Sequence, residues 1–267
     1  MIYLKTEREL VLMRRAGKIV ADILDALRET IRPGVSTAEL DRVAERHISL
    51  AGGTASFKGY RPFHAPIPFP GTICVSVNEE VVHGIPSDTK ILREGDIVSV
   101  DVGVCLDGYH GDAACTYPVG TVGEARQQLL QVTETALDRA LAVIKAGNTV
   151  GDIGYAVESY VLGQGYGVVR DYTGHGVGKK IHEAPQVPNF GKPGRGVTLQ
   201  RGMTLAIEPM VMAGEEKIRV GADAWVVVTA DGSDAAHFER SVVVTDEGPE
   251  VLTPWAGHSA AVAGENG

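Results

Sequence analysis

The sequence lacks the features that mark several specialised classes of protein. No apolar run approaches the ~18 residues that a membrane helix needs. The net charge of −9, without any dense run of Lys and Arg, argues against a nucleic-acid partner, because phosphate binding needs a basic face. The three cysteines, Cys74, Cys105 and Cys115, form no CxxC pair and cannot all pair with one another. These absences predict a globular protein of the reducing cytoplasm, with no membrane contact and no direct nucleic-acid binding.

Familiar catalytic motifs are missing as well. The chain contains no GxSxG of serine hydrolases, no HExxH of zinc peptidases, no GxxxxGK[ST] phosphate loop and no GxGxxG dinucleotide motif. Its 267 residues are 44% hydrophobic and 22% charged, so it has no disorder signature and can bury a large core. The N-terminal MIYLKTEREL turns polar by its fifth residue, from which we expect no signal peptide. Any catalytic chemistry must come from a less familiar pattern.

The sequence repeats itself in two halves. IRPGVSTAELDRVAERHI starts at residue 31 and IKAGNTVGDIGYAVESYV at residue 144, and both run Ile, basic residue, Gly, hydroxyl and acid before an amphipathic stretch. Each follows a long helix, which we expect over 7–29, with a capping box from Thr6 and Glu9, and over 123–144. We therefore predict an α+β fold in which two helix, helix, strand units, about 5–120 and 121–250, pack across a pseudo-two-fold axis around a central antiparallel sheet.

A second repeated stretch carries acidic residues. LREGDIVSVDVG (92–103) aligns with LQRGMTLAIEPM (199–210), so that Gly95 matches Gly202 and Asp101 matches Glu208. Each half thus brings one acid to the same point of an equivalent strand. Duplication for stability alone would also produce a repeat. It would not explain why the copied feature is an acid.

Two further acids and a histidine belong to the same pattern. Asp101 and Asp112 lie on two strands joined by the turn LDGYHG, and a hairpin can make them cross-strand neighbours. Glu239 begins another strand after the turn DGSD, and His175 lies in YTGHGVGKK, where glycines let the backbone approach a site. Taken singly, a strand-end acid is usually solvated and such a histidine usually has no special role. Their combination points to a site.

Four acids gathered at the centre of a sheet need cations. At ~4 Å and an effective dielectric of ~20, each pair of carboxylates repels by about 4 kcal/mol. Two divalent ions would cancel the four charges, and His175 adds one neutral nitrogen. Ligation rich in oxygen with one imidazole suits Mn(II), Fe(II) or Co(II) better than structural zinc. Two such ions can lower the pKa of a shared water towards ~7, so the pattern predicts hydrolysis.

Together these residues resemble the type I methionine aminopeptidases, which have the pita-bread fold. The resemblance covers about residues 3–254 and implies a single catalytic domain over 1–254, with a disordered tail at 255–267. It also implies a dinuclear centre of Co, Mn or Fe(II). In it Asp101 binds one ion, Asp112 and Glu239 bridge both, and His175 with Glu208 completes the second.

The resemblance also assigns catalytic and substrate-binding residues. Glu208 matches the general base, His83 in NEEVVHGIP matches a histidine near the substrate amide, and His182 in HEAPQV matches one that stabilises the tetrahedral intermediate. A capped turn before Pro86 or Pro185 is the alternative for these two histidines. The apolar methionine pocket implied by the resemblance, which could equally be plain core, comprises Tyr60, Phe69, Cys74, Ile181 and Trp225.

The implied activity is removal of the initiator methionine from nascent proteins when a small residue follows. The implied partners are peptides with an N-terminal Met, nascent chains and the ribosome, and we expect a monomer. The loop over 61–73 is longer than usual in the family, and its role stays open. Three alternatives remain: a proline-specific aminopeptidase of the same fold, a creatinase-like hydrolase without metal, and a binding module without activity. Relatives of the first kind usually carry a large N-terminal domain and read EPG where this chain reads EPM.

Overall fold

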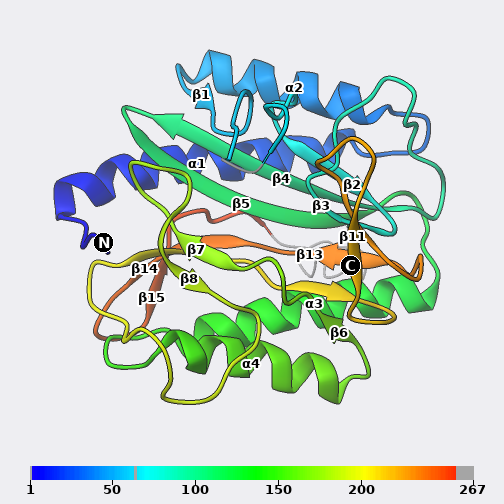
Figure 1. Cartoon of the computed structure of the whole chain (residues 1–267). Helices are drawn as coiled ribbons and strands as arrows, with labels where there is room; N and C mark the ends of the chain where they lie inside the picture. Colours follow the sequence, from blue (N-terminus) through cyan, green and yellow to red (C-terminus); the bar gives the residue numbers. More distant parts are fainter. Residues whose placement is uncertain (1, 63–64, 257–267) are drawn as a thin grey trace, which may run out of the picture.

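The protein is built from two helix pairs that enclose a layer of strands (Figure 1). The computed structural model describes residues 2–62 and 65–256. Helices α1 (Glu7–Thr30) and α2 (Thr37–Leu50) cover one side, and α3 (Glu124–Ala142) and α4 (Val150–Gly163) cover the other. No helix among these residues is both long enough and apolar enough to cross a bilayer.

Local capping explains where the helices begin. Thr6 accepts a hydrogen bond from the N–H of Glu9, whose carboxylate accepts one from the N–H of Thr6, which confirms the predicted capping box. Thr149 and Asp152 form the equivalent box at α4. Ser36 caps α2 by accepting from the N–H of Glu39. The helices predicted over 7–29 and 123–144 match α1 and α3 to within two residues at each end.

The strands form antiparallel ladders throughout the described residues. The first half contains β1 (Thr54–Ala55), β2 (Cys74–Val77), β3 (Glu80–Val82), β4 (Ile97–Leu106) and β5 (Tyr109–Pro118). The second half contains β6 (Gly167–Val168), β7 (Gly174–Gly176), β8 (Glu183–Val187), β9 (Thr204–Ile207), β10 (Met210–Met212), β11 (Ile218–Val220), β12 (Val227–Thr229), β13 (Ala235–His237), β14 (Arg240–Val244) and β15 (Pro249–Val251). The main sheet of the first half pairs β4 with β1, β2 and β5, and that of the second half runs β15-β14-β9-β7-β8.

Backbone geometry repeats between the halves. Gly95 and Gly202, which the sequence aligns, both have a φ of 88°, and Gly34 and Gly147 have φ values of 90° and 97°. A side chain strongly disfavours this left-handed conformation, so glycine is needed before the strands β4 and β9. The matching angles support the predicted duplication.

The two halves join along β5 and the segment 237–241. The N–H of Glu239 donates to the carbonyl of Ala114 at 2.9 Å, and Ser241 Oγ donates to the carbonyl of Asp112 at 2.7 Å. At the other end of the joint, Thr116 Oγ1 bonds both the N–H and the carbonyl of His237. The joint therefore brings the acid-bearing strands of both halves side by side at the centre of the molecule.

A continuous hydrophobic core supports this joint. Helix α1 packs on β4 and β5, and α3 packs on β9, β10 and β13. The core includes Trp255, which is 3% exposed and donates through Nε1 to the carbonyl of Glu239. This contradicts the predicted start of a disordered tail at residue 255, because the indole fills core space beside β14. The rest of that prediction, over 257–267, lies outside the described residues.

Candidate metal centre and active site

The hairpin β4–β5 supplies two carboxylates. Asp101 pairs with Ala114 and Asp112 with Gly103, so the acids are diagonal neighbours rather than directly opposite each other. Diagonal positions lie on the same face of the sheet. The ten-residue ladder fixes this register, and a slip by one residue between the strands would place the two carboxylates on opposite faces of the sheet.

The second half supplies two carboxylates and an imidazole. Glu208 follows directly after β9, and Glu239 directly precedes β14, which pairs with β9. His175, in the middle of β7, pairs with Ala206 of β9. The glycines on either side of His175 allow this close packing, since a Cβ at Gly174 would lie 2.5 Å from the Ala206 carbonyl oxygen and one at Gly176 would lie 2.3 Å from that of Ala184.

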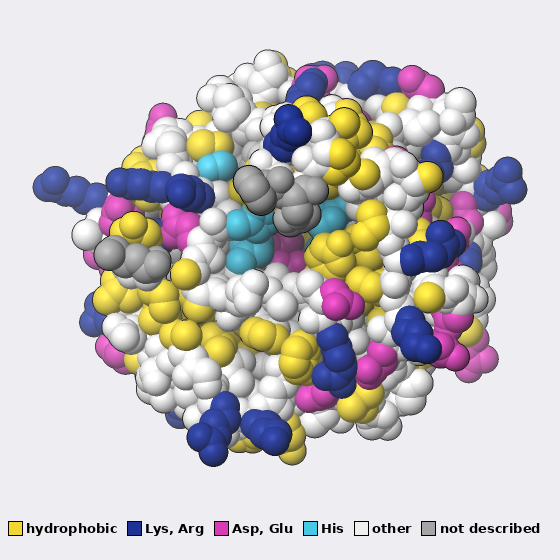
Figure 2. Space-filling model, viewed as in Figure 1, with side chains coloured by type: hydrophobic (Ala, Val, Ile, Leu, Met, Phe, Trp, Pro, Cys, Tyr) yellow, Lys and Arg dark blue, Asp and Glu magenta, His cyan; other side chains and the backbone are white. Residues whose placement is uncertain are grey.

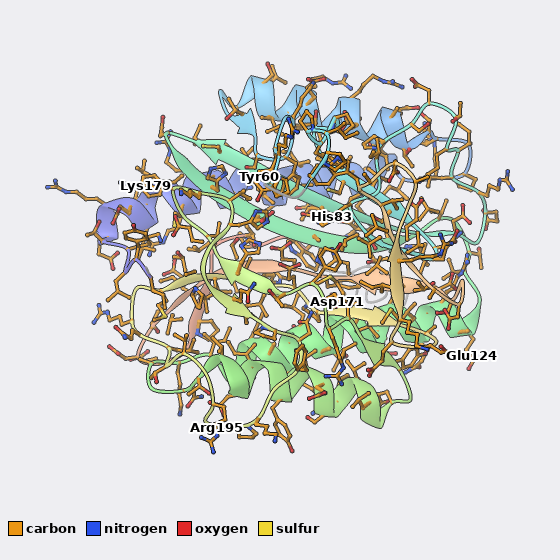
Figure 3. The ribbon with its side chains drawn as sticks, viewed as in Figure 1. Tyr60, His83, Glu124, Asp171, Lys179 and Arg195 are labelled. Atoms are coloured by element: carbon orange, nitrogen blue, oxygen red, sulfur yellow. The ribbon has the colours of Figure 1, made fainter. Side chains whose placement is uncertain are left out.

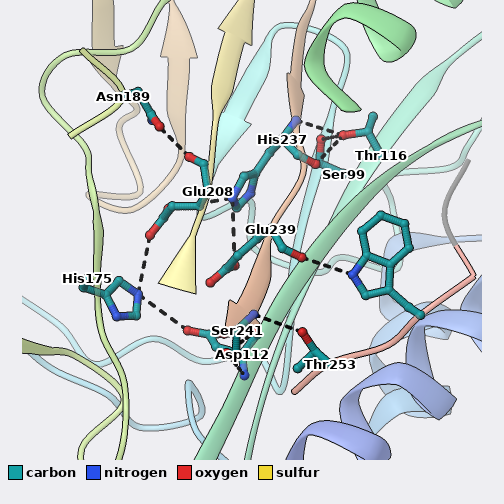
Figure 4. A network of polar contacts seen from close by, with 11 residues as sticks. Ser99, Asp112, Thr116, His175, Asn189, Glu208, His237, Glu239, Ser241 and Thr253 are labelled. Carbon is teal, nitrogen blue, oxygen red and sulfur yellow. Dashed lines mark hydrogen bonds and ion pairs between the residues drawn. The ribbon is translucent and has the colours of Figure 1, made fainter. Parts of the chain in front are cut away.

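These side chains converge on one point (Figure 4). Potential ligand atoms of Asp112, His175 and Glu239 all lie within 4.8 Å of one another. His175 Nε2 is 3.6 Å from Asp112 Oδ2 and 3.4 Å from Glu208 Oε1. Asp101 lines the same cavity. The structure thus gathers around one cavity all five residues that the resemblance names as ligands.

The donor set fits divalent cations. Buried oxygens of three of its acids have no hydrogen-bond partner, namely Asp101 Oδ1, Asp112 Oδ1 and Glu239 Oε1. Buried polar atoms nearly always have partners, and unpaired buried charge is costly. Cations at these oxygens would satisfy them, as hard carboxylate and imidazole donors suit Mn(II), Fe(II) or Co(II).

The electrostatics of the metal-free cluster lead to the same conclusion. Burial raises the pKa of Asp101 to about 7. Burial, and then repulsion from neighbouring carboxylates, raises the pKa of Asp112, Glu208 and Glu239 well above the usual range. Burial lowers the pKa of His175 to about 3, so its imidazole is neutral at pH 7, the form that binds a metal.

Two more histidines border the cluster. The His182 ring lies 4.4 Å from that of His175, and its Nδ1 lies 2.9 Å from the Tyr60 hydroxyl. His83 has a φ of 61°, unusual for a residue with a side chain, and its ring meets Trp225 edge to face. Burial lowers the pKa of both His83 and His182 to about 4. Both imidazoles are therefore neutral at pH 7.

A cavity of about 990 Å³ is lined by the four acids and His175, and Figure 2 shows histidine and acidic side chains at the bottom of a hollow in this face. All predicted substrate-binding residues line the cavity except Ile181. Ile181 still belongs to the same apolar cluster as the other predicted pocket residues, and this cluster also includes Phe57 and Ala65. Tyr60 and His83 come from separate segments of the first half (Figure 3).

His237 is a site residue that the sequence reasoning missed. It lies at the end of β13, lines the cavity, and places Nε2 3.7 Å from Glu208 Oε2 and 4.0 Å from Glu239 Oε2. Burial, and then the charge on His83, lowers its pKa to about 3. Its position two residues before Glu239 was the available signal, because alternate residues of an extended segment share a face.

The class of protein follows from comparison with known families. The model described as metallopeptidase family M24 matches residues 11–246, and the chain belongs to this family. "Methionine aminopeptidase 1" of Bacillus subtilis is 49% identical over 253 residues, which cover 95% of this chain and 99% of the relative.

Solved structures confirm the predicted fold. The crystal structure of methionine aminopeptidase from Thermotoga maritima has a TM-score of 0.91 and 45% identity, over 95% of this chain and 99% of that chain. An Xaa-Pro dipeptidase from Bacillus anthracis has a TM-score of 0.75 and 27% identity, and the match covers 94% of this chain but 62% of that one. The pita-bread fold is thus shared with proline-specific enzymes, whereas the full length is shared with methionine aminopeptidases.

Proposed function

We propose that this protein is a metal-dependent aminopeptidase that removes the initiator methionine from nascent proteins, with a preference for a small second residue. The observation that carries the proposal is the position of a buried cluster of acids and a histidine beside an apolar cluster in one cavity. The methionine aminopeptidases that match almost the whole chain support it.

The chain's own residues would hold two divalent ions. Asp101, Asp112, His175, Glu208 and Glu239 provide four carboxylates and one imidazole for Co, Mn or Fe(II) ions. Once bound, the ions supply Lewis-acid polarisation of the scissile carbonyl and make a water acidic. Asp112, in β5, and Glu239, directly before β14 of the other half, would be the ligands that the two ions share.

Three side chains act on the substrate or on the attacking water. Glu208 takes the proton of the attacking water, since its carboxylate borders the cluster and its Oε1 lies 3.4 Å from His175 Nε2. His182 Nδ1 lies 2.9 Å from the Tyr60 hydroxyl. With that hydroxyl donating to Nδ1, the ring carries its proton on Nε2, which donates to the oxyanion that develops on the substrate. His83 lines the same cavity and holds the scissile amide.

The apolar cluster selects methionine. Phe69, Cys74 and Trp225 line the cavity and Ile181 belongs to the same apolar cluster. These apolar side chains suit an unbranched thioether better than a charged or β-branched side chain. The acids attract the free α-amino group, so N-acetylated peptides bind poorly. A bulky second residue would press against the rim near His83 and push the carbonyl away from the metal cluster, and ~1 Å of displacement can cost ~10²-fold in rate.

The proposed substrate, a newly synthesised chain, places the protein in the compartment of protein synthesis. A monomer acting in the cytoplasm on chains that emerge from the ribosome is the arrangement that we propose. The three cysteines are free, as expected in a reducing compartment.

One comparison separates this proposal from the proline-specific alternative. Met-Ala-Ser and Ala-Pro-Ser are supplied at equal concentration to the Mn(II)-loaded protein, and the released amino acid is measured. We expect fast release of methionine, slow release from Met-Leu and Met-Lys peptides, and little release from Leu-Ala. Faster release of alanine from Ala-Pro-Ser would overturn the proposal in favour of a proline-specific aminopeptidase.

A further inference from the structure

His237 is held more firmly than a side chain that merely fills space. Its N–H donates to Thr116 Oγ1 at 2.9 Å, and its carbonyl accepts from the same hydroxyl at 2.8 Å. Thr116 Oγ1 in turn lies 2.8 Å from Ser99 Oγ, and all three residues are buried. The backbone at His237 is therefore fixed to β5 in the other half of the molecule.

The imidazole of His237 has a buried ring nitrogen without a hydrogen-bond partner. Its side chain is 2% exposed, and Nε2 has no hydrogen-bond partner. An unpaired polar atom at such depth costs about 1–3 kcal/mol. The atoms facing it are Glu208 Oε2 at 3.7 Å and Glu239 Oε2 at 4.0 Å, which lie only ~1 Å beyond normal hydrogen-bond length.

Glu208 consequently lies between two imidazoles. His175 Nε2 approaches Oε1 at 3.4 Å, and His237 Nε2 approaches Oε2 at 3.7 Å (Figure 4). His237 therefore faces the Glu208 oxygen that does not face His175. Both atoms that face His237 Nε2 are carboxyl oxygens, and an N–H at Nε2 would give the ionised, metal-binding form of either acid a donor.

We infer that His237 is a positioning residue, whose Nε2–H donates to the Glu208 carboxylate and fixes its orientation for metal binding and proton transfer. The inference rests on the ligand and base roles proposed for Glu208. Partners of this kind orient a metal ligand, and their loss typically costs 10–100-fold in metal affinity.

The test uses metal binding rather than activity. Wild-type, His237→Leu and His237→Gln proteins are stripped with chelator, Mn(II) is titrated in by calorimetry, and the visible absorption of the Co(II) forms is recorded. Leu has a similar bulk but no donor, so it should weaken Mn(II) affinity by ~10–100-fold and change the Co(II) spectrum. Gln keeps an N–H, and it should restore affinity to within ~3-fold.

A matched control is His47→Leu. His47 is a partly buried histidine of α2 whose Nδ1 contacts the Val43 carbonyl oxygen of its own helix, so its loss should leave Mn(II) affinity unchanged. If His237→Leu does not fold, His237→Asn takes its place, because its amide is too short to reach Glu208. Comparison with His237→Gln then gives the same decision.

Two outcomes would overturn the inference: wild-type affinity in His237→Leu, or failure of His237→Gln to recover it. In the first case the hydrogen bond contributes nothing to the metal centre, and in the second the imidazole acts as a ligand or by packing. Failure of the wild-type protein to bind Mn(II) at all would instead refute the proposed metal centre.

Discussion

Asp112 is the carboxylate whose replacement should disturb the centre most. Its side chain is buried, its Oδ2 faces His175 at 3.6 Å, and its Oδ1 has no hydrogen-bond partner. The backbone on either side is fixed, because the N–H of Asp112 donates to Ser241 Oγ and its carbonyl accepts from the same hydroxyl. A substitution there removes a ligand without an obvious route for the backbone to compensate.

We expect Asp112→Ala to abolish activity. The change removes a proposed bridging ligand from both ions and leaves the three other acids in mutual repulsion. Methionine release from Met-Ala-Ser is measured after chelation and readdition of Mn(II), with metal content determined in parallel. Glu239→Ala should behave in the same way. Wild-type turnover in Asp112→Ala would show that the centre is not dinuclear in the way proposed.

His182 should affect the rate without affecting the metal. His182→Ala removes the proposed donor to the developing oxyanion, so kcat should fall by ~10²-fold or more while metal content stays near that of wild type. Tyr60→Phe is a useful companion, since it removes only the hydroxyl that orients the ring. If His182→Ala lost its metal, His182 would have to be reassigned as a ligand.

The segment before α1 holds the loop that carries His182. Lys5 N–H donates to the Gly202 carbonyl at 2.7 Å, and its ammonium lies 2.8 Å from Glu183 Oε2. Glu183 also accepts from the N–H of Lys180. The two charged side chains are 4% and 7% exposed, so this ion pair is shielded from solvent. A local element at the N-terminus thus supports the loop of the second half that carries His182.

Breaking this buried pair should be costly. Lys5→Met keeps the length of the side chain but leaves Glu183 as a buried unpaired charge, which should lower the free energy of unfolding by about 3 kcal/mol. Lys58→Met is the control, because the pair of Lys58 with Glu45 is about half exposed and should contribute less than ~1 kcal/mol. Urea unfolding gives both values. Equal effects of the two substitutions would show that Lys5 has no special structural role.

Helices and strands could be predicted from the sequence where the pattern that specifies them lies within the element itself. The caps at Thr6 and Ser36 specify helix starts directly, and alternation along β4 and β5 specifies a hairpin. The diagonal positions of Asp101 and Asp112 depend on which two residues of LDGYHG form the tip of the hairpin. The sequence of this stretch does not determine which two they are. His237 was missed because its significance comes from Glu208, a residue of another strand.

The duplicated molecule brings like charges from both halves to one interior site. Between the halves, the joint of β5 with 237–241 aligns acids that are more than a hundred residues apart in the chain. The repeated acid in the sequence allowed this meeting to be predicted. Burial of Trp255 was not predictable, because a single aromatic near the C-terminus gives no periodic signal.

After chelator has removed the metal, the free energy of unfolding of the protein should fall as the pH rises above 6.5. Burial raises the pKa of Asp101 to about 7 and raises those of the other three acids well above their usual range, so the folded state holds protons that the unfolded state releases. Stability from these groups is present at low pH and is lost as pH rises through the raised values.

Histidines act in the opposite direction, but only at lower pH. The pKa values of His83, His175, His182 and His237 are lowered to about 3 or 4, so these groups destabilise the fold below their unfolded value of ~6.5, and their effect fades within about one pH unit above it. Melting temperatures at pH 7.5 and 8.5 therefore isolate the carboxylates. Bound Mn(II) should abolish the fall, and an equal fall with and without metal would exclude the acid cluster as its cause.

The central claim is that two metal ions held by the acid cluster enable removal of methionine. Protein purified without oxygen is stripped with chelator and titrated with Mn(II), while bound metal and methionine release from Met-Ala-Ser are measured in the same samples. The account predicts no release from the stripped protein, and full release once two ions per chain are bound. Undiminished release of methionine by the metal-free chain would contradict it.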